Sequence, residues 1–581
     1  MKHDHDGMPS LSAFVSTIPK NNTRDRSPVF EELHPLLSPE AAYAESLRCL
    51  ECGSQNSPAP CTVACPSDID VPGFIKALAQ SNPKWAAEII LQENPLGGTC
   101  ARVCPTEELC EGACVLREAG RRPVAIGRLQ RYAADTVLLS EKQDELLRVP
   151  PKPQHVAIIG AGPAGMACAA KLSQQGYQVT VYEARSEPGG LARFAIAPYR
   201  LWKTPLTEEM TRIARLGVTF RFNSPVKSQA DLEAIKESAD AIFLSVGLGN
   251  DIDSGYPGDH LPGVFTSLRF IEQIKTGNLP QIGRHVVVVG GGNTAIDVAR
   301  ESLLMGATDV TMIYRRTEKE MPAYRAEVEA ALKEGVRFLW LTLPVRFLGP
   351  DRLTSVECRY ARLGSPDESG RRYPEPIFGS EFELKADTAV LARGQQPRRE
   401  WTQWIPEITM SGKRILVDPQ TGQTPHPGVF AGGDAVNGGT TVVQAVREGK
   451  IAARGIQNFL EKFTGKKPEH STVPSRSTLP SLPVPLSPIM VYKQQGEELL
   501  TVNRSWCKGC NVCVENCPTS ILALDDNELI YVKDISQCIA CGLCAVFCPD
   551  FVFSLNVPDP KSLHSLEAGE IQKNSKPTDL G

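Results

Sequence analysis

Several features that mark other classes of protein are missing from these 581 residues. No apolar run approaches the roughly 18 residues of a membrane-spanning helix, so we expect no transmembrane segment. The N-terminus (MKHDHDGMPSLSAFVSTIPK) lacks the apolar stretch of a secretory signal, which favours a soluble, cytoplasmic protein. Basic and acidic residues number 62 and 67 and are well mixed, so the charge does not indicate a nucleic-acid partner. Histidines number only nine, and no catalytic dyad is recognisable, so we expect the chemistry to come from cofactors.

Cysteine, by contrast, is abundant. Of 18 cysteines, eight lie at 49–114 and eight at 507–548. Clusters at Cys-x2-Cys spacing, in a chain with no export signal, indicate metal sites rather than disulfides. Cys168 and Cys358 stand apart from both clusters, and we interpret them as small core residues.

The stretch at 153–184 (PQHVAIIGAGPAGMACAAKLSQQGYQVTVYEA) carries the central motif. A short apolar strand runs into Gly160-x-Gly162-x-x-Gly165, a helix follows to about residue 175, and a second strand ends at Glu183. The first glycine permits a tight turn, the second lets the backbone approach a pyrophosphate, and the third allows close helix–strand packing. A carboxylate at the strand end can accept from ribose hydroxyls. The sequence therefore predicts a dinucleotide-binding βαβ unit.

A second unit of this kind occupies 285–316 (HVVVVGGGNTAIDVARESLLMGATDVTMIYRR). Its turn reads Gly290-x-Gly292-x-x-Ala295, and the fingerprint allows Ala in the third place. Two fingerprints predict two dinucleotides, FAD and a nicotinamide nucleotide. Arg315 and Arg316 replace the carboxylate at the strand end, which favours the 2′-phosphate of NADP(H), although NAD(H) stays open. Asn293 and Thr294 open the helix and are predicted contacts of the same nucleotide.

The N-terminal cysteines surround helical patterns, with an amphipathic helix expected over roughly 71–91 and another from 126 into the 130s. Eight cysteines can hold two [4Fe–4S] clusters, although paired cysteines also bind tetrahedral zinc. The Cys-Pro pairs and the flavin-type fold favour iron–sulfur. Spacing alone would join four of these residues in one tetrad: Cys100, Cys104, Cys110 and Cys114.

Residues 40–460 resemble the small (β) subunit of bacterial glutamate synthase and the N-terminal half of dihydropyrimidine dehydrogenase. The resemblance rests on CTVACP (61–66), ARVCPTEELCEGAC (101–114), AIGRLQRY (125–132) and the first βαβ unit. It implies interleaved cluster ligands and leaves Cys100 over as a non-ligand. The loop GSQNSPAP before Cys61 is longer than the family's usual gap. One cluster would then take Cys49, Cys52, Cys61 and Cys114, and the other Cys65, Cys104, Cys110 and Gln130.

The resemblance also implies flavin contacts beyond the first fingerprint. The segment at 187–201 would pass the flavin ring, and the strand at 239–249 would return the chain to the flavin domain. At 428–453, Asp434 would accept from the ribityl chain and a helix starting near Thr441 would face the ring. YRRTEKEMPAYRAE resembles NADPH-using members and adds Arg325 as a third phosphate contact. The remaining predicted FAD contacts are Pro163, Ala164, Gly190, Leu191, Gly247, Gly433 and Val442.

The strongest motif is C-terminal. Two Cys-x2-Cys-x2-Cys-x3-Cys-Pro runs form the bacterial ferredoxin repeat, in which the fourth cysteine of each run ligates the other cluster. Residues 490–556 resemble the δ subunit of 2-oxoacid:ferredoxin oxidoreductases. One cluster is predicted to take Cys507, Cys510, Cys513 and Cys548, and the other Cys517, Cys538, Cys541 and Cys544.

These features predict a multidomain chain with a helical iron–sulfur N-terminal domain, two Rossmann-like α/β domains and a C-terminal α+β ferredoxin domain. Six prolines in 468–488 indicate a stiff linker. The predicted ranges are an arm at 1–40, a helical [4Fe–4S] domain at 41–150, an FAD domain at 151–283 and 395–463, an NAD(P) domain at 284–394, a linker at 464–490, a ferredoxin domain at 491–556 and a tail at 557–581.

A nicotinamide exchanges hydride and a cluster carries single electrons, so a flavin that can do both must lie between them. With four clusters, the sequence predicts an electron-transfer subunit of an oxidoreductase complex. The ferredoxin module favours a thiamine-dependent 2-oxoacid oxidoreductase as partner. The alternatives are a glutamate synthase small subunit, a stand-alone NAD(P)H:ferredoxin oxidoreductase, or a passive electron wire.

Overall fold

The computed structural model describes residues 36–53, 58–140, 149–249, 251–366, 372–397, 399–463, 489–494, 497–504, 507, 512–525, 529–539, 543–544, 548 and 553–555. Two compact units are present: one comprises 1–48 with 61–471, and the other 49–60 with 472–581. The predicted arm up to residue 35, nearly all of the linker and the tail lie outside the described residues. Within the described part, no helix is long and apolar enough to cross a bilayer.

The helical module precedes the first sheet. Three of its helices begin at a side chain that accepts from a free backbone N–H group, as at Asp70, whose carboxylate accepts from the N–H of Gly73 at 3.2 Å. The expected single helix over 71–91 is wrong: Ser81 has φ +57°, and Pro83 opens a new helix because proline suits the first helical position. The helices are α2 (Pro39–Ser46), α3 (Pro60–Val63), α4 (Val71–Ala79), α5 (Pro83–Glu93), α6 (Gly97–Val103), α7 (Val115–Glu118) and α8 (Ile126–Leu138).

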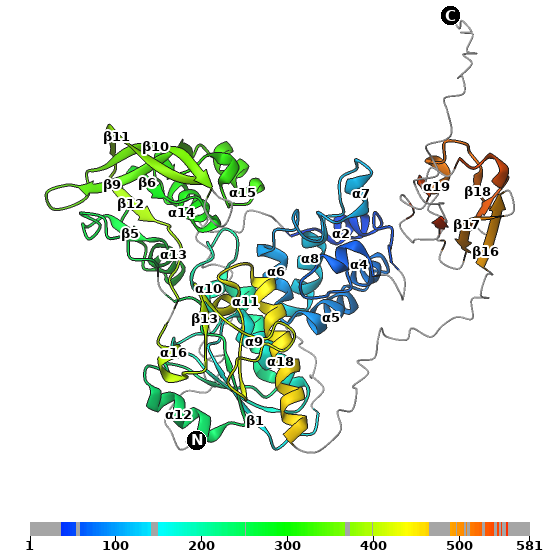
Figure 1. The fold of residues 1–581 in the computed structure, drawn as a ribbon, viewed down its shortest axis with the longest axis horizontal. Helices are drawn as coiled ribbons and strands as arrows, with labels where there is room; N and C mark the ends of the chain where they lie inside the picture. Colours follow the sequence, from blue (N-terminus) through cyan, green and yellow to red (C-terminus); the bar gives the residue numbers. More distant parts are fainter. Residues whose placement is uncertain are drawn as a thin grey trace, which may run out of the picture. The chain divides into compact units, whose positions relative to one another are not determined.

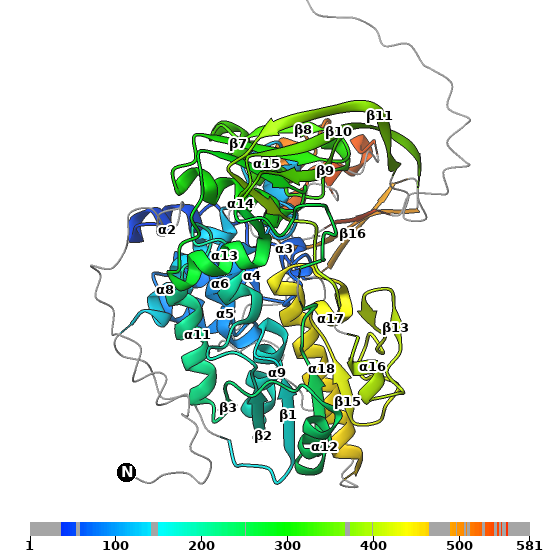
Figure 2. The same ribbon diagram turned by 90° about the vertical axis from the view of Figure 1, so that its left-hand side faces the viewer.

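The first parallel sheet has the strand order β15-β4-β1-β2-β3. Its central strands are apolar runs because helices cover both faces of a parallel sheet. In Figures 1 and 2, α9 and the long α18, which are far apart in sequence, lie side by side against this sheet. The strands are β1 (His155–Ile159), β2 (Gln178–Tyr182), β3 (Thr219–Arg221), β4 (Ala241–Leu244) and β15 (Val429–Ala431). The helices are α9 (Pro163–Gln174), α10 (Gly190–Phe194), α11 (Lys203–Arg215), α12 (Gln229–Ser238), α16 (Trp401–Trp404), α17 (Asp434–Asn437) and α18 (Val442–Phe463). A separate two-stranded ladder pairs β13 (Met410–Ser411) with β14 (Arg414–Ile415).

The second parallel sheet is inserted between β4 and β15 in the sequence and has the order β5-β12-β6-β7-β8. Helices pack on one face, and a three-stranded antiparallel sheet, β11-β10-β9, covers the other (Figure 2). Its elements are β5 (Val264–Thr266), α13 (Ser267–Thr276), β6 (His285–Val289), α14 (Asn293–Leu304), β7 (Asp309–Tyr314), η2 (Glu318–Glu320), α15 (Arg325–Lys333), β8 (Arg337–Trp340), β9 (Thr342–Leu348), β10 (Ser355–Pro366), β11 (Arg372–Lys385) and β12 (Thr388–Leu391).

The C-terminal unit contains a hairpin before the cysteine repeats. β16 (Ile489–Gln494) pairs with β17 (Glu497–Asn503), and β17 pairs with β20 (Phe553–Leu555), all antiparallel. A second small ladder joins β18 (Leu522–Leu524) to β19 (Ile530–Val532), and the short helices are α19 (Val512–Glu515) and η4 (Ile535–Gln537).

The predicted fold class is confirmed: a helical module, two parallel-sheet modules and a small C-terminal α+β module are present. Cys168 and Cys358 are fully buried in apolar clusters, as expected of core residues. The exact module boundaries stay predictions.

Candidate functional site

The first glycine turn has one open position and two closed ones. Gly160 has φ +104°, and a Cβ there would lie 2.5 Å from the carbonyl oxygen of Ser245. A Cβ on Gly165 would lie 2.1 Å from the carbonyl oxygen of Gly160. No protein atom lies within 4 Å of the Cβ position at Gly162. The protein's own packing therefore explains Gly160 and Gly165, whereas Gly162 faces space that a pyrophosphate can fill.

Glu183 stands at the end of β2, next to this turn. Its carboxylate accepts from the backbone N–H groups of Ala161 (2.8 Å) and Arg185 (2.9 Å). Burial raises its pKa, and these hydrogen bonds oppose the rise. The side chain is therefore held in place beside the turn, and Glu183 also lines a neighbouring cavity.

A cavity of about 560 Å³ connects the predicted flavin contacts. All of them except Gly165 line it, although they come from segments between residues 160 and 442. The opposite wall includes Asn293 and Thr294 from the start of α14, so both βαβ units border one space. The further lining residues, which the sequence did not single out as contacts, include Val103, Arg200, Asp297 and Tyr324.

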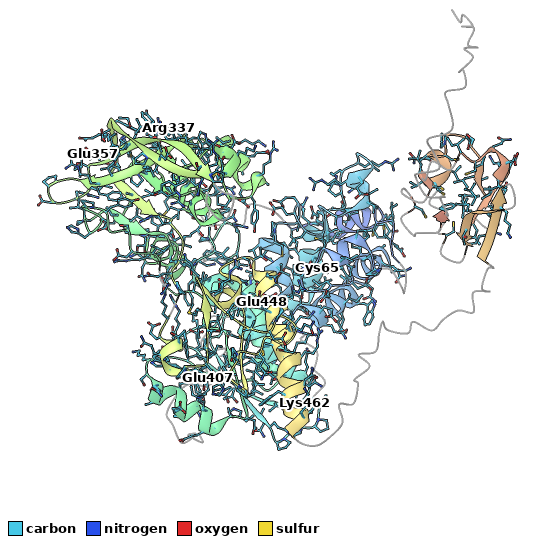
Figure 3. The ribbon with its side chains drawn as sticks, in the orientation of Figure 1. Cys65, Arg337, Glu357, Glu407, Glu448 and Lys462 are labelled. Carbon is cyan, nitrogen blue, oxygen red and sulfur yellow. The ribbon has the colours of Figure 1, made fainter. Side chains whose placement is uncertain are left out.

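A side chain of α18 holds the turn before α17 in place through hydrogen bonds. Glu448, labelled in Figure 3, accepts from the backbone N–H of Gly433 at 2.6 Å and from the side-chain amide of Asn437 at 3.2 Å. Gly433 has φ +73°, which favours glycine. Asp434 follows it on the cavity wall, and burial raises the pKa of its carboxyl group. Glu448 therefore positions the predicted ribityl acceptor, a role that no sequence motif indicated.

The second glycine turn repeats the pattern. Gly290 has φ +149°, and a Cβ there would lie 2.3 Å from the carbonyl oxygen of Ala392. Gly292 has no protein atom within 4 Å of its Cβ position, and Ala295 is fully buried. Asn293 accepts from the backbone N–H of Tyr324 at 2.9 Å, which connects the start of α14 to the segment before α15. The open face again lies where a nucleotide phosphate would approach a helix N-terminus.

The three arginines predicted to bind a 2′-phosphate have different surroundings. Arg315 is exposed at the end of β7. Arg316 is nearly buried, and its Nε donates to the carbonyl oxygen of Arg372 at 2.8 Å. The side chain of Arg325 is 92% exposed and pairs with Glu329 at 2.9 Å on the surface of α15.

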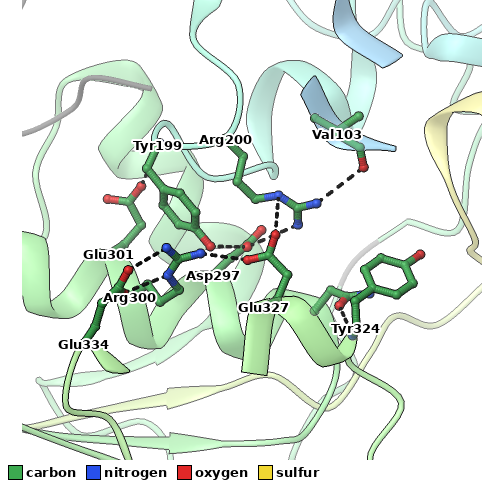
Figure 4. A network of polar contacts seen from close by, with 10 residues as sticks. Val103, Tyr199, Arg200, Asp297, Arg300, Glu301, Tyr324, Glu327 and Glu334 are labelled. Carbon is green, nitrogen blue, oxygen red and sulfur yellow. Dashed lines mark hydrogen bonds and ion pairs between the residues drawn. The ribbon is translucent and has the colours of Figure 1, made fainter. Parts of the chain in front are cut away.

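A polar network joins the cavity to the helical module (Figure 4). The guanidinium of Arg200 donates to the carbonyl oxygen of Val103 at 3.4 Å and lies 3.4 Å from a carboxylate oxygen of Asp297. The hydroxyl of Tyr199 donates to the same carboxylate at 2.8 Å. Arg300 pairs with both Glu327 and Glu334. The segment 199–200 of the flavin module is thereby connected to α14, α15 and the end of α6.

Four thiols of the helical module lie close together around α6. The pKa of Cys104 is raised well above its usual value by a hydrogen bond with Cys100, by burial and by the neighbouring Cys110 and Cys65 thiols. The pKa of Cys65 (Figure 3) is raised by burial and by Cys100, and that of Cys110 by burial and by Glu111, Cys65 and Cys61. A mutually repelling set of buried thiolates suits iron, whose positive charge offsets the repulsion.

The predicted non-cysteine ligand lies on α8. The side-chain amide of Gln130 donates to the carbonyl oxygen of Gly97 at 2.7 Å, which orients the amide nitrogen toward the start of α6. Gln130 is 8% exposed. Its oxygen, the only atom of this side chain suited to bind iron, is not used in that contact.

The other predicted ligands of the helical module belong to different compact units. Cys114 is buried at the start of α7, and Cys49 and Cys52 belong to the second compact unit. Cys100, expected to be a non-ligand, is 1% exposed and hydrogen-bonded to Cys104. Both groupings of these cysteines, by spacing and by resemblance, remain predictions.

In the C-terminal unit, Cys510 and Cys541 lie outside the described residues. Cys513 and Cys548 are buried in its apolar core, and Cys507, Cys517, Cys538 and Cys544 pack against that core. The Cys507 sulfur accepts from the backbone N–H of Ile530 at 3.2 Å. Burial raises the pKa of Cys517, but hydrogen bonds from the Thr519 hydroxyl and nearby N–H groups lower it more. These contacts stabilise thiolates, the form that binds iron.

Among the described residues, no three His, Cys, Asp or Glu side chains converge on one point as a single bound ion requires. A [4Fe–4S] cluster does not need that convergence, because each of its thiolates binds a different iron.

Three family models match the chain, and together they cover most of it. Residues 26–142 match dihydropyrimidine dehydrogenase domain II with its 4Fe-4S cluster, residues 154–449 match pyridine nucleotide-disulphide oxidoreductase, and residues 506–554 match a 4Fe-4S dicluster domain. These matches follow the three parts of the predicted architecture.

Curated relatives match most of this chain. The chain is 36% identical over 457 residues to the glutamate synthase [NADPH] small chain of Halomonas elongata, which covers 76% of this chain and 96% of the relative. It is 36% identical over 492 residues to the putative oxidoreductase UacF of Escherichia coli, covering 79% and 75%. It is 38% identical over 442 residues to the NADPH-Fe(3+) oxidoreductase subunit beta of Geobacter sulfurreducens, covering 70% and 64%.

Proposed function

The chain belongs to the family of the glutamate synthase small chain, and from this premise we propose that it exchanges hydride with NADP(H) at a bound FAD and transfers single electrons through [4Fe–4S] clusters to or from a partner protein. It is an oxidoreductase with a pyridine-nucleotide domain and 4Fe-4S domains.

One observation carries the proposal. A single cavity is lined by the first glycine turn, by the start of the second nucleotide helix at Asn293, and by Val103, the residue before Cys104. Nicotinamide, flavin and the nearest cluster must be neighbours if hydride is to become single electrons. The cavity brings the three corresponding parts of the chain to one place.

When bound, the flavin supplies the change from two-electron to one-electron chemistry. The chain's own residues bind and orient. Gly162 and Gly292 leave room for the phosphates of the two nucleotides, and the N-termini of α9 and α14 provide backbone N–H groups. Glu183 and Asp434 offer carboxylate acceptors along the cavity wall.

We further propose four clusters with the ligand sets predicted above. The support is the close company of Cys65, Cys104 and Cys110, the orientation of Gln130, and the sulfur hydrogen bonds of Cys507 and Cys517. Iron and sulfide analysis of anaerobically purified protein tests the number: close to 16 of each per chain is expected for four cubanes, as each holds four irons. About eight would mean that only one pair of clusters is present.

For the partner, we propose the catalytic subunits of a thiamine-dependent 2-oxoacid oxidoreductase, with electrons entering at the ferredoxin module and leaving to NADP+. The support is the ferredoxin repeat with its hairpin β16–β17. A second candidate has a specific observation in its favour. The relatives named above include glutamate synthase small chains and an NADPH-Fe(3+) oxidoreductase subunit, which favours NADPH oxidation with electrons flowing outward.

The first test is anaerobic reduction of viologen dye by the purified chain with NADPH. Rapid turnover is expected, and the Gly292→Ala variant should lose it. A chain that binds FAD but never bleaches the flavin with NADPH would be a passive electron wire. Pull-down of the native protein then separates the partners: thiamine-dependent subunits support the first candidate, and a large glutamate synthase chain supports the second.

A further inference from the structure

Two arginines flank the second glycine turn at the same level. Strands β12 and β7 lie on either side of β6, and Leu391, Val289 and Ile313 form one row of the sheet. Arg393 and Arg315 each follow this row by two residues along the chain, as does Gly291 of the turn. Two strand spacings of about 4.8 Å place their backbones roughly 10 Å apart. Two long side chains can meet across that distance.

Neither guanidinium is neutralised by a carboxylate within the described residues. Arg393 donates to the carbonyl oxygen of Ser254 at 3.0 Å and lies 5.0 Å from the ring centre of Tyr256. Both partners are uncharged, so they hold the group in place and leave its charge intact. Arg315 is solvent-exposed, and its pKa is lowered by partial loss of hydration and by the charges of Arg316 and Arg393.

Other arginines of the same module behave differently. Arg300 pairs with Glu327 and Glu334, and Arg337, labelled in Figure 3, pairs with Asp309. Like charges placed together without a counter-charge destabilise the free protein unless an anion binds between them. A phosphate dianion also matches the forked geometry of guanidinium groups.

Arg316 and Arg325, the other two arginines predicted to bind the 2′-phosphate, make contacts with other parts of the protein. The Nε of Arg316 donates to the carbonyl oxygen of Arg372 and ties β7 to the β10–β11 hairpin. Arg325 extends from the outer face of α15 and pairs with Glu329. The second candidate cation is thus Arg393 in the loop after β12, a strand that the sequence motif does not include.

We propose that Arg315 and Arg393 together bind the 2′-phosphate of NADP(H) and set the preference for this nucleotide over NAD(H). The inference rests on the proposed function, because it concerns the same nucleotide site. It assigns a specificity residue to the loop after β12 and removes Arg325 from the site.

The test measures binding and turnover with matched nucleotides. The probes are 2′,5′-ADP against ADP, by calorimetry, and NADPH against NADH in dye reduction. Arg393→Gln and Arg315→Gln should each weaken 2′,5′-ADP binding and raise the KM for NADPH about 10- to 100-fold, the loss expected for one charge-assisted contact. The affinity for ADP and the KM for NADH should not change. Arg325→Gln, the matched control, should resemble the wild type in all four measurements.

The proposal would be overturned if Arg393→Gln weakened the binding of 2′,5′-ADP and ADP equally and raised the KM for NADPH and NADH equally. The residue would then act on the nucleotide as a whole. No effect of Arg393→Gln would also overturn it. The proposed function fails separately, if the wild-type chain does not oxidise NADPH at all. FAD content and the thermal midpoint identify a variant that has simply misfolded, and Arg393→Lys, which keeps the charge, should then restore part of the preference.

Discussion

The carboxylate of Glu209 in α11 accepts hydrogen bonds from both the backbone N–H and the hydroxyl of Thr99 in α6. It also accepts from the backbone N–H of Gly98 at 2.7 Å. A side chain of the flavin module therefore caps the helix that ends next to Cys104. Glu209 has no exposed surface, so this contact is built into the interior between the two modules.

Glu209 should make stability depend on pH. Burial raises its pKa from 4.5 to about 7, against the opposing hydrogen bonds from Thr99 and Gly98. The folded chain thus holds an extra proton between these values, and the stabilisation is full below pH 4.5 and lost as pH rises toward 7. Glu209→Gln keeps an acceptor for the cap but cannot titrate. Melting curves between pH 5 and 8 should fall less steeply with pH for this variant.

The control is Glu329→Gln, a change on the exposed face of α15, which should follow the wild-type pH profile. If the stability of Glu209→Gln also follows the wild-type pH profile, then a group other than Glu209 holds the extra proton of the folded chain.

Substitutions at Gly162, whose Cβ position is open, and at Gly165, whose Cβ position is closed, should separate effects on cofactor binding from effects on folding. Gly162 has φ −75°, which alanine adopts without strain, and its Cβ position is empty. Gly162→Ala should therefore fold with a nearly unchanged thermal midpoint and lose most of its FAD. Gly165→Ala pushes a methyl group onto the carbonyl oxygen of Gly160 and should destabilise the apoprotein by about 1–3 kcal/mol. Flavin absorbance and calorimetry on both variants check this.

Gly292→Ala is the matched variant of the second turn. It should retain FAD and lose NADPH-dependent bleaching. Loss of FAD from this variant would mean that the two turns serve one nucleotide.

Gln130 should set the potential of its cluster. A neutral ligand leaves the cluster less negatively charged, so Gln130→Glu should lower the midpoint. The carboxylate would also face the carbonyl oxygen of Gly97, now 2.7 Å from the amide nitrogen. A redox titration followed by electron paramagnetic resonance measures the shift. An unchanged midpoint would count against Gln130 as a ligand.

Arg200 should affect the step from flavin to cluster more than the step from nicotinamide to flavin. Arg200→Gln removes the cation between Val103 and Asp297 and leaves a buried carboxylate whose remaining hydrogen-bond partner among the described residues is Tyr199. Breaking a buried pair costs about 3–5 kcal/mol, so the junction of the modules should loosen. Stopped-flow mixing with NADPH should show near-normal flavin bleaching and slower cluster reduction. Equal slowing of both phases, or of neither, would contradict this.

Local sequence patterns predicted both glycine turns and the α/β modules that follow them. The flavin contacts beyond the first turn were implied by the resemblance to the glutamate synthase small subunit, and they stay predictions. A positive φ or a close approach at Gly160 depends on a few neighbouring atoms, so spacing along the chain reveals it. The expected helix over 71–91 failed for the same kind of local reason, because Pro83 begins a new helix and the apolar periodicity continues through the break.

The tertiary structure decided which side chains act together. Val103, Arg200 and Asp297 are separated by about a hundred residues each, and only the packing of α6, the flavin segment and α14 brings them to one network. The same holds for Glu209 with Thr99. A long charged side chain has many possible partners in a sequence. The partner is chosen by the register of neighbouring strands and by which surfaces the modules bury, and these are properties of the folded chain.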